Sequence, residues 1–301
     1  MLAPRIVFPA VMALCLTTVW LLLQNGVHEG IAVFAVLIPG ALTIAFLERL
    51  MPYRQDWNQS DGDTKTDIIH LVIAQISIPR LMKPVWLASL ATATTWAGQT
   101  YGPNLWPHHW NIVAQLFLML VIAEFGRYWF HRAAHNITFL WRFHAVHHSP
   151  NRLYWMNAGR FHPIEKVYLL IPEVVPFVIL GTNAEALAMY FVFNGIHGLF
   201  QHSNIHVRLG WLNYIFSMTE LHRWHHSKWI EDSNNNYGNN LIIWDIIFGT
   251  FYWPKGKEVE SIGVFNPDYP KDYLGQLAAP FQGDIDKTSA DGICHHQEKS
   301  V

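Results

Sequence analysis

Long apolar runs, separated by short polar connectors, set the overall pattern of the chain. Residues 6–23, 31–47 and 111–130 are each rich in apolar side chains. A helix needs about 20 such residues to cross a hydrocarbon core of ~30 Å, so each run can span a membrane. A shorter pair, 167–180 and 186–200, flanks the connector GTNAE and predicts a helical hairpin. The pattern therefore predicts an all-α fold, an integral membrane helical bundle with about four to six membrane-embedded helices.

Two stretches leave alternatives open. Residues 6–23 could be a cleaved signal peptide, but no small-x-small site follows and another apolar run begins at once, which favours a permanent span. Residues 67–98 are apolar overall but are interrupted by two prolines and two basic residues between positions 79 and 84. This second stretch predicts either an interfacial helix followed by a span or one broken span.

The basic residues are distributed unevenly along the chain. The connectors 24–30, 99–110 and 181–185 contain none of the 20 Lys and Arg residues. Because cytoplasmic loops carry an excess of Lys and Arg, these connectors are expected outside the cell or in the lumen. Both termini, and the polar segments that follow residues 130 and 200, are then predicted to face the cytoplasm as a helical cap.

Composition agrees with a membrane protein that has a polar cap, since 51% of the 301 residues are hydrophobic and only 14% are charged. The net charge of −2 and the lack of a basic run argue against nucleic acid as a partner, because phosphate binding needs clustered Lys and Arg. Cys15 and Cys294 are too few and too poorly placed for a disulfide framework, a zinc ribbon or an iron–sulfur cluster. Any metal must be held mainly by imidazole.

Ten of the 18 histidines occur in four short motifs: HRAAH at 131–135, HAVHH at 144–148, HSNIH at 202–206 and HRWHH at 222–226. Residues three or four positions apart share a helical face, with Cβ atoms about 5–6 Å apart, so the histidines of one motif can point at one ion. The ten are His131, His135, His144, His147, His148, His202, His206, His222, His225 and His226.

A lone histidine near an apolar face is usually a core or interface residue, which is how we interpret His28 and His70. Ten clustered imidazoles are different, because buried together they would leave polar nitrogens unpaired unless metal ions gathered them. Ten nitrogens exceed what one ion can take, so two ions are predicted. Imidazole alone admits zinc, iron, copper or nickel.

At these motifs the chain resembles the membrane fatty acid hydroxylase and sterol desaturase superfamily, whose mark is the ordered set HxxxH, HxxHH, HxxxH, HxxHH. The resemblance runs from about residue 123 to 252 and includes the flanking stretches 157–165 and 235–253. It implies a di-iron centre at the cytoplasmic membrane surface, ligated by the ten histidines, that uses O₂ to attack a C–H bond of a lipid. Zinc could replace the iron in preparations.

The resemblance also divides the chain. We expect an N-terminal transmembrane region over residues 1–110, a catalytic domain over 111–253 and a C-terminal soluble tail over 254–301. The amphipathic stretch 239–251 could cover the site or lie against the bilayer.

Three residues outside the motifs are predicted to assist catalysis: Glu124, His162 and Asp245. Glu124 lies seven residues before His131 on the same helical face, inside an apolar run where a carboxylate is costly without a partner. It could orient a ligand imidazole, or it could pair with Arg127 or Arg160. Glu165 and His197 are weaker candidates of the same kind.

Electrons are expected from a separate donor, cytochrome b5-like, ferredoxin or rubredoxin, since the chain has no dinucleotide-binding glycine motif. Two other functions stay open from the residues alone. A dizinc membrane hydrolase would usually have carboxylate ligands, and a metal transporter would favour ligands near the middle of the bilayer. The sequence leaves both the bacterial inner membrane and the endoplasmic reticulum open as the location.

Overall fold

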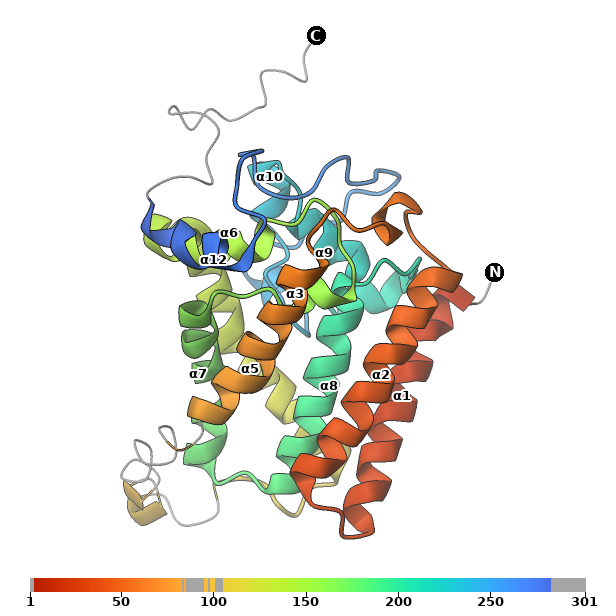
Figure 1. Ribbon diagram of the computed structural model, residues 1–301. Helices are drawn as coiled ribbons and strands as arrows, with labels where there is room; N and C mark the ends of the chain where they lie inside the picture. The colour runs from red at the N-terminus through yellow and green to blue at the C-terminus, as the bar shows by residue number, and fades with distance from the viewer. Residues whose placement is uncertain (1–2, 83, 85–94, 97, 101–104, 283–301) are drawn as a thin grey trace.

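The computed structural model describes residues 3–82, 84, 95–96, 98–100 and 105–282. Five long helices lie side by side, and a cap of short helices and loops covers one end of them (Figure 1). The described residues contain no named strand, only isolated bridges, which confirms the all-α prediction. The long helices are α1 (Ala3–Gln24), α2 (Glu29–Leu50), α5 (Ile112–Asn136), α7 (Pro163–Leu180) and α8 (Ala184–His202).

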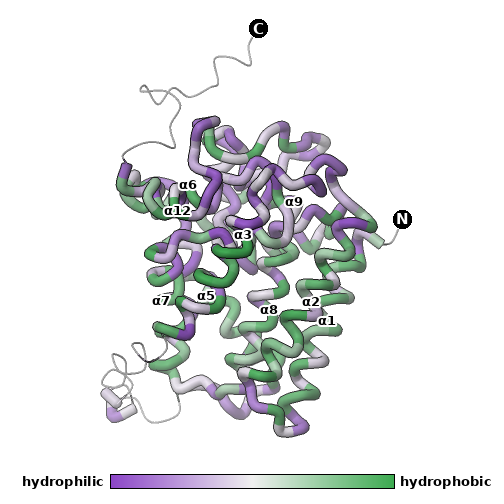
Figure 2. Tube along the Cα trace, viewed as in Figure 1, coloured by the Kyte–Doolittle hydropathy of each residue, from purple (hydrophilic) through white to green (hydrophobic). Residues whose placement is uncertain are grey.

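Three of these helices, α1, α2 and α5, are long and apolar enough to cross a membrane among the residues described. Figure 2 shows the consequence, with hydrophobic helix shafts and a predominantly hydrophilic cap. The predicted hairpin is present as α7 and α8. Both helices are apolar, but α7 also carries Glu165, Lys166 and Glu173, all buried.

Helix α8 packs against α1, α2 and α5. Its approach to α2 is close because two glycines face long aliphatic side chains. A Cβ on Gly40 of α2 would collide with Ile196, and a Cβ on Gly195 of α8 would come within 2.7 Å of Leu37. Small residues at such contacts allow helices in a membrane to pack tightly.

The cap is built from short elements that come from distant parts of the chain. Residues 67–82 of the stretch 67–98 form a helix that leaves the cap and runs down beside the long helices (Figure 1), and most of the remainder lies outside the described residues. Helix α3 (Thr64–His70) starts at the cap and continues through the π-helical turn Leu71–Ser77 down the side of the bundle (Figure 1). The other short helices of the cap are α6 (Thr138–His148), α9 (Thr219–His225), α10 (Ile230–Ser233), α11 (Ile243–Ile247) and α12 (Tyr273–Ala278). The 3₁₀ turns are Asp56–Asn58, Trp155–Gly159, Gly210–Tyr214 and Ala279–Phe281.

The first part of the expected C-terminal tail is folded onto this cap. Thr66 donates a hydrogen bond to the carbonyl of Lys271 over 2.8 Å, and Gln276 Oε1 lies 2.9 Å from His70 Nε2. The other ring nitrogen of His70 lies 3.1 Å from the Phe161 carbonyl. His70 is therefore a satisfied core residue that joins α3 to α12.

Buried ion pairs fix the loop that follows α6. Arg152 binds Asp63 through two hydrogen bonds of 3.0 and 2.8 Å, and Arg160 binds Asp67 at 2.5 Å. All four side chains are buried. Paired charges of this kind are costly to break singly, so they hold residues 150–160 firmly against α3.

Candidate metal centre

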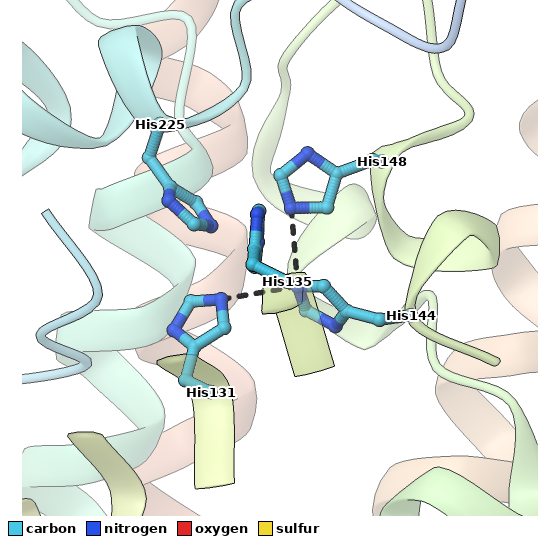
Figure 3. Close-up of side chains that lie close together, drawn as sticks. All are labelled: His131, His135, His144, His148 and His225. Carbon is cyan, nitrogen blue, oxygen red and sulfur yellow. Dashed lines mark hydrogen bonds between the residues drawn. The ribbon is translucent and has the colours of Figure 1, made fainter. Parts of the chain in front are cut away.

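Nine of the ten motif histidines form two groups inside the cap. In each group the possible ligand nitrogens all lie within 4.8 Å of one another. The first group, drawn in Figure 3, takes side chains from α5, α6 and α9. The second takes them from α6, α8 and the end of α9. The first group is His131, His135, His144, His148 and His225, and the second group is His147, His202, His222 and His226.

Each HxxHH motif divides its histidines between the two groups. On α6, His144 and His148 are one turn apart and join the first group, whereas His147 points to the second. The end of α9 reverses this arrangement, since His222 and His226 join the second group and His225 joins the first. The i and i+4 positions share a face that the i+3 position does not fully share, which explains the division. Each HxxHH motif therefore supplies histidines to both groups and links them through one helix.

The Nε2 atoms converge within each group. In the first group, His144 Nε2 lies 3.0 Å from that of His131 and 3.1 Å from that of His148. In the second group, His222 Nε2 lies 3.1 Å from that of His202 and 3.0 Å from that of His226. A single proton cannot satisfy several nitrogens that face one point, whereas a cation can.

Unpartnered nitrogens test this directly. His135 Nε2 and His225 Nε2 are buried, and each lacks a hydrogen-bond partner among the residues described. Such orphaned atoms are rare in proteins and require an explanation. A metal ion at the centre of the first group would supply the missing partner, so these residues fit a metal site.

Hydrogen bonds from Nδ1 orient four of the five rings of the first group. His131 Nδ1 lies 2.7 Å from the Tyr237 carbonyl, and His225 Nδ1 lies 2.9 Å from the Asn235 carbonyl. His135 Nδ1 lies 3.1 Å from Asn234 Oδ1, and His144 Nδ1 lies 2.6 Å from Glu165 Oε1. Because each of these oxygens accepts a hydrogen bond from Nδ1–H, the proton stays on Nδ1 and Nε2 keeps its lone pair for a metal.

The second group uses acceptors from other parts of the chain. His147 Nδ1 lies 3.1 Å from the Arg160 carbonyl, in the loop held by the buried ion pairs, and His202 Nδ1 lies 3.1 Å from the Gly198 carbonyl. Burial, followed by repulsion between neighbouring imidazoles, lowers the pKa of His222 and His226 well below the usual value. The neutral ring that results is the form that binds metal.

His206 lies in neither group. Helix α8 ends at His202, and Ser203 is extended, so the four-residue spacing of HSNIH does not follow a helix here. His206 Nε2 instead accepts a hydrogen bond of 2.9 Å from Arg208 Nε. The structure thus brings together nine of the ten predicted ligands.

The three predicted assisting residues contact no motif imidazole directly. Glu124 accepts the backbone N–H groups of residues 239–241, and Asp245 accepts those of Tyr237 and Gly238. His162 caps the start of α7 by accepting the N–H of Ile164 over 3.1 Å.

The suggested ion pairs of Glu124 are not observed either. Arg127 binds Glu173 and Arg160 binds Asp67. His197 is fully buried in α8 but belongs to neither group. Of the weaker candidates, only Glu165 holds a motif histidine, His144. Asn234 was not found from sequence, because no motif marks it.

Known proteins share this arrangement of motifs. A profile of the fatty acid hydroxylase family matches residues 116–250, a range that includes all four motifs. The chain is 37% identical to the ornithine lipid hydroxylase OlsE of Rhizobium tropici, over 92% of this chain and 83% of that protein. The chain belongs to the fatty acid hydroxylase family. The resemblance seen in the four motifs is thereby confirmed, and the protein is a membrane oxidoreductase of this family.

Two further relatives match about half of the chain. Human alkylglycerol monooxygenase is 32% identical over 48% of this chain and 33% of its own length. The rice very-long-chain aldehyde decarbonylase GL1-11 is 26% identical over 48% of this chain and 54% of its own length. No solved structure matches the chain.

Proposed function

We propose that the protein is an O₂-dependent di-iron oxygenase that hydroxylates a membrane lipid. The observation that carries the proposal is the pair of imidazole groups, with six of the nine rings oriented by hydrogen bonds at Nδ1 and with Nε2 atoms directed inward. Nine neutral nitrogen ligands would hold two ions and leave room for further ligands, as catalytic sites require. Bound iron would supply the activation of O₂.

The chain's own residues contribute orientation and the exclusion of water. Four acceptors in the first group, and the Arg160 carbonyl at His147, fix the orientation of five rings. The Nε2 atoms of these rings are therefore in place before an ion binds. The histidines of the second group are all buried. Burial of this kind keeps a reactive site from water and directs it toward the substrate.

The position of the site supports a lipid as the substrate. The histidines that α5 and α8 supply lie at the C-terminal ends of these long helices, and the others come from the cap helix α6 and from α9 with its C-cap residue. Next to α5, α11 exposes Ile243, Ile246 and Ile247, and its Trp244 packs on Phe125 of α5 at 4.8 Å between ring centroids. These exposed apolar side chains would let a lipid approach from the bilayer. Ornithine lipid, named for the relative from Rhizobium tropici, is the first candidate.

Comparison of lipids from cells with and without the gene tests the proposed reaction. We expect one lipid to gain a single oxygen atom when the gene is present, and a variant with His147 and His225 both changed to alanine to abolish that gain. A mass spectrum of the total lipid extract measures it. Loss of two hydrogens instead would indicate desaturation, and an unchanged lipid profile would contradict a lipid substrate in that host.

The electron donor and the orientation complete the proposal. A separate cytochrome b5-like protein, ferredoxin or rubredoxin would dock on the cap. The cap would face the cytoplasm, in a bacterial inner membrane or the endoplasmic reticulum, because the basic residues avoid the connectors 24–30, 99–110 and 181–185.

Cysteine labelling tests this orientation. In a background without Cys15 and Cys294, a cysteine replacing His109 should react with an impermeant thiol reagent added to intact cells. A cysteine replacing Lys257, which is exposed on the cap, should react only after the cells are broken. The opposite pattern would invert the topology.

A further inference from the structure

We propose that Glu124 and Asp245 are paired positioning residues that fix the segment 234–241 and, through it, the first histidine group but not the second. The proposal rests on the two-metal function given above. Neither carboxylate touches an imidazole, so both act through the segment.

The segment supplies three of the acceptors that orient the first group. Asn234 Oδ1 holds His135, and the carbonyls of Asn235 and Tyr237 hold His225 and His131. These three rings come from α5 and α9, which are far apart in sequence. One short loop therefore sets the relative orientation of two helices' ligands.

Glu124 holds one end of the segment. Its carboxylate is fully buried and accepts the backbone N–H groups of Asn239, Asn240 and Leu241, the last two over 2.8 and 3.2 Å. Three convergent amides suit an anion, which stabilises an ionised carboxylate inside the protein. These three hydrogen bonds join the segment directly to α5 at Glu124, two turns before His131.

Asp245 holds the middle of the segment from α11. Its two oxygens accept the N–H groups of Tyr237 and Gly238, each over 2.8 Å, and one also accepts the Thr250 hydroxyl over 2.7 Å. A Cβ at Gly238 would collide with the Leu241 carbonyl and lie 3.0 Å from Asp245 Oδ2. Glycine is therefore needed at this position for the carboxylate to reach the backbone.

Asn236 ties the segment 234–241 to the backbone of a third part of the chain. It adopts a positive φ of 55°, and its side chain exchanges hydrogen bonds of 2.7 and 2.9 Å with the backbone of Tyr252. Asparagine tolerates this left-handed conformation better than most residues other than glycine, and the two hydrogen bonds of its side chain fix it here. The segment is thus held in a single conformation between its two ends.

The second group takes no described Nδ1 acceptor from this segment. The Nδ1 acceptors described for His147 and His202 are the carbonyls of Arg160 and Gly198, which belong to other parts of the fold. Near the second group, the segment forms hydrogen bonds with Gln201 and Leu221, the residues before His202 and His222. A change at Glu124 or Asp245 should therefore disturb one ion and spare the other, a selectivity that a general loss of stability would not produce.

Metal binding to full-length Glu124→Gln and Asp245→Asn proteins in detergent tests the proposal. In each variant an amide NH₂ replaces one carboxylate oxygen. Because an NH₂ group cannot accept a hydrogen bond from a backbone N–H, the segment loses part of its anchoring. Titration with Fe(II) under anaerobic conditions should show one of the two ions bound about 10- to 100-fold more weakly, because outer partners of metal ligands have effects of this size. The other ion should keep its affinity. Two ions of unchanged affinity, or equal weakening of both, would overturn the proposal.

A matched control shows whether weaker metal binding is specific to Glu124 and Asp245 or follows the loss of any buried carboxylate. Glu48 is also buried and accepts two backbone N–H groups, those of Trp155 and Asn204, each over 2.8 Å. Neither residue belongs to the segment 234–241. Glu48→Gln should therefore leave the affinity of the first group unchanged, and weakening there equal to that of Glu124→Gln would contradict the proposal.

A milder pair of variants applies if those proteins do not fold. Asn234→Ala removes only the acceptor on His135, whereas Asn234→Asp keeps an oxygen in the same place. We expect the first to weaken one ion and the second to restore it; equal affinities in both would overturn the proposal. Wild-type protein that binds two ions but shows no O₂-dependent turnover would refute the proposed function and leave this inference standing.

Discussion

Replacing His225 with alanine is expected to remove one of two bound metal ions and to abolish lipid oxidation. Its Nε2 is buried and has no hydrogen-bond partner among the residues described, so metal binding is the role that accounts for it. The loss of affinity should exceed the roughly 10- to 100-fold expected for an outer partner. Metal analysis of the purified variant, together with turnover, measures both effects.

His206 provides the matched control within the same set of motifs. It lies outside both groups and bonds to Arg208, so His206→Ala should retain both ions and most of the activity. His202→Ala, four residues earlier, should lose the ion of the second group. The assignment of two groups would be wrong if His206→Ala lost an ion while His225→Ala kept both.

Acid is expected to destabilise the metal-free protein steeply below about pH 6.5, the ordinary pKa of histidine. Burial, followed by repulsion between the rings, lowers the pKa of five buried cap histidines well below the usual value. Burial lowers that of His225 to about 4. The six are His144, His147, His148, His222, His225 and His226.

The sign follows from proton binding. Below pH 6.5 the unfolded chain binds protons at these positions that the folded chain does not, so stability falls as the pH falls and is fully present above 6.5. Each histidine contributes about 1.4 kcal/mol per pH unit, and six together make the dependence several-fold steeper. Thermal melting of chelator-treated protein between pH 5.5 and 7.5 measures it. A melting temperature that rose or stayed constant on acidification would contradict the buried, neutral state of these rings.

The apolar pattern was enough to predict the main helices. The runs 6–23 and 31–47 became α1 and α2 with ends shifted by three residues or fewer, because little but a helix satisfies the backbone of such a run in a membrane. The four histidine motifs likewise predicted the site, since clustered imidazoles have few structural explanations.

Spacing could not predict how the histidines would be shared. HSNIH and HRAAH have the same spacing, yet only the second lies on one helix; α8 ends at His202 and directs His206 elsewhere. A helix end depends on local capping and on tertiary contacts, which a five-residue motif does not contain. The division of each HxxHH motif between two groups also depends on how α6 and α9 face each other.

The acceptors around the imidazoles were the least predictable part. The carbonyls of Tyr237 and Asn235 are backbone atoms that every sequence has, so no residue type marks them. Glu124 and Asp245 stood out as carboxylates in apolar surroundings, but sequence suggested that they touch imidazoles or arginines. Folding placed a loop between them and the histidines.

The most direct test of the oxygenase assignment is the origin of the oxygen atom in the product. Purified protein loaded with iron should be incubated with bilayer lipid, a reductant system and ¹⁸O₂, and the product examined by mass spectrometry. We predict one ¹⁸O atom in the hydroxylated lipid, and no conversion when either O₂ or the reductant is left out. Conversion at full rate under anaerobic conditions, or oxygen derived only from water, would contradict the oxygenase and favour a hydrolase.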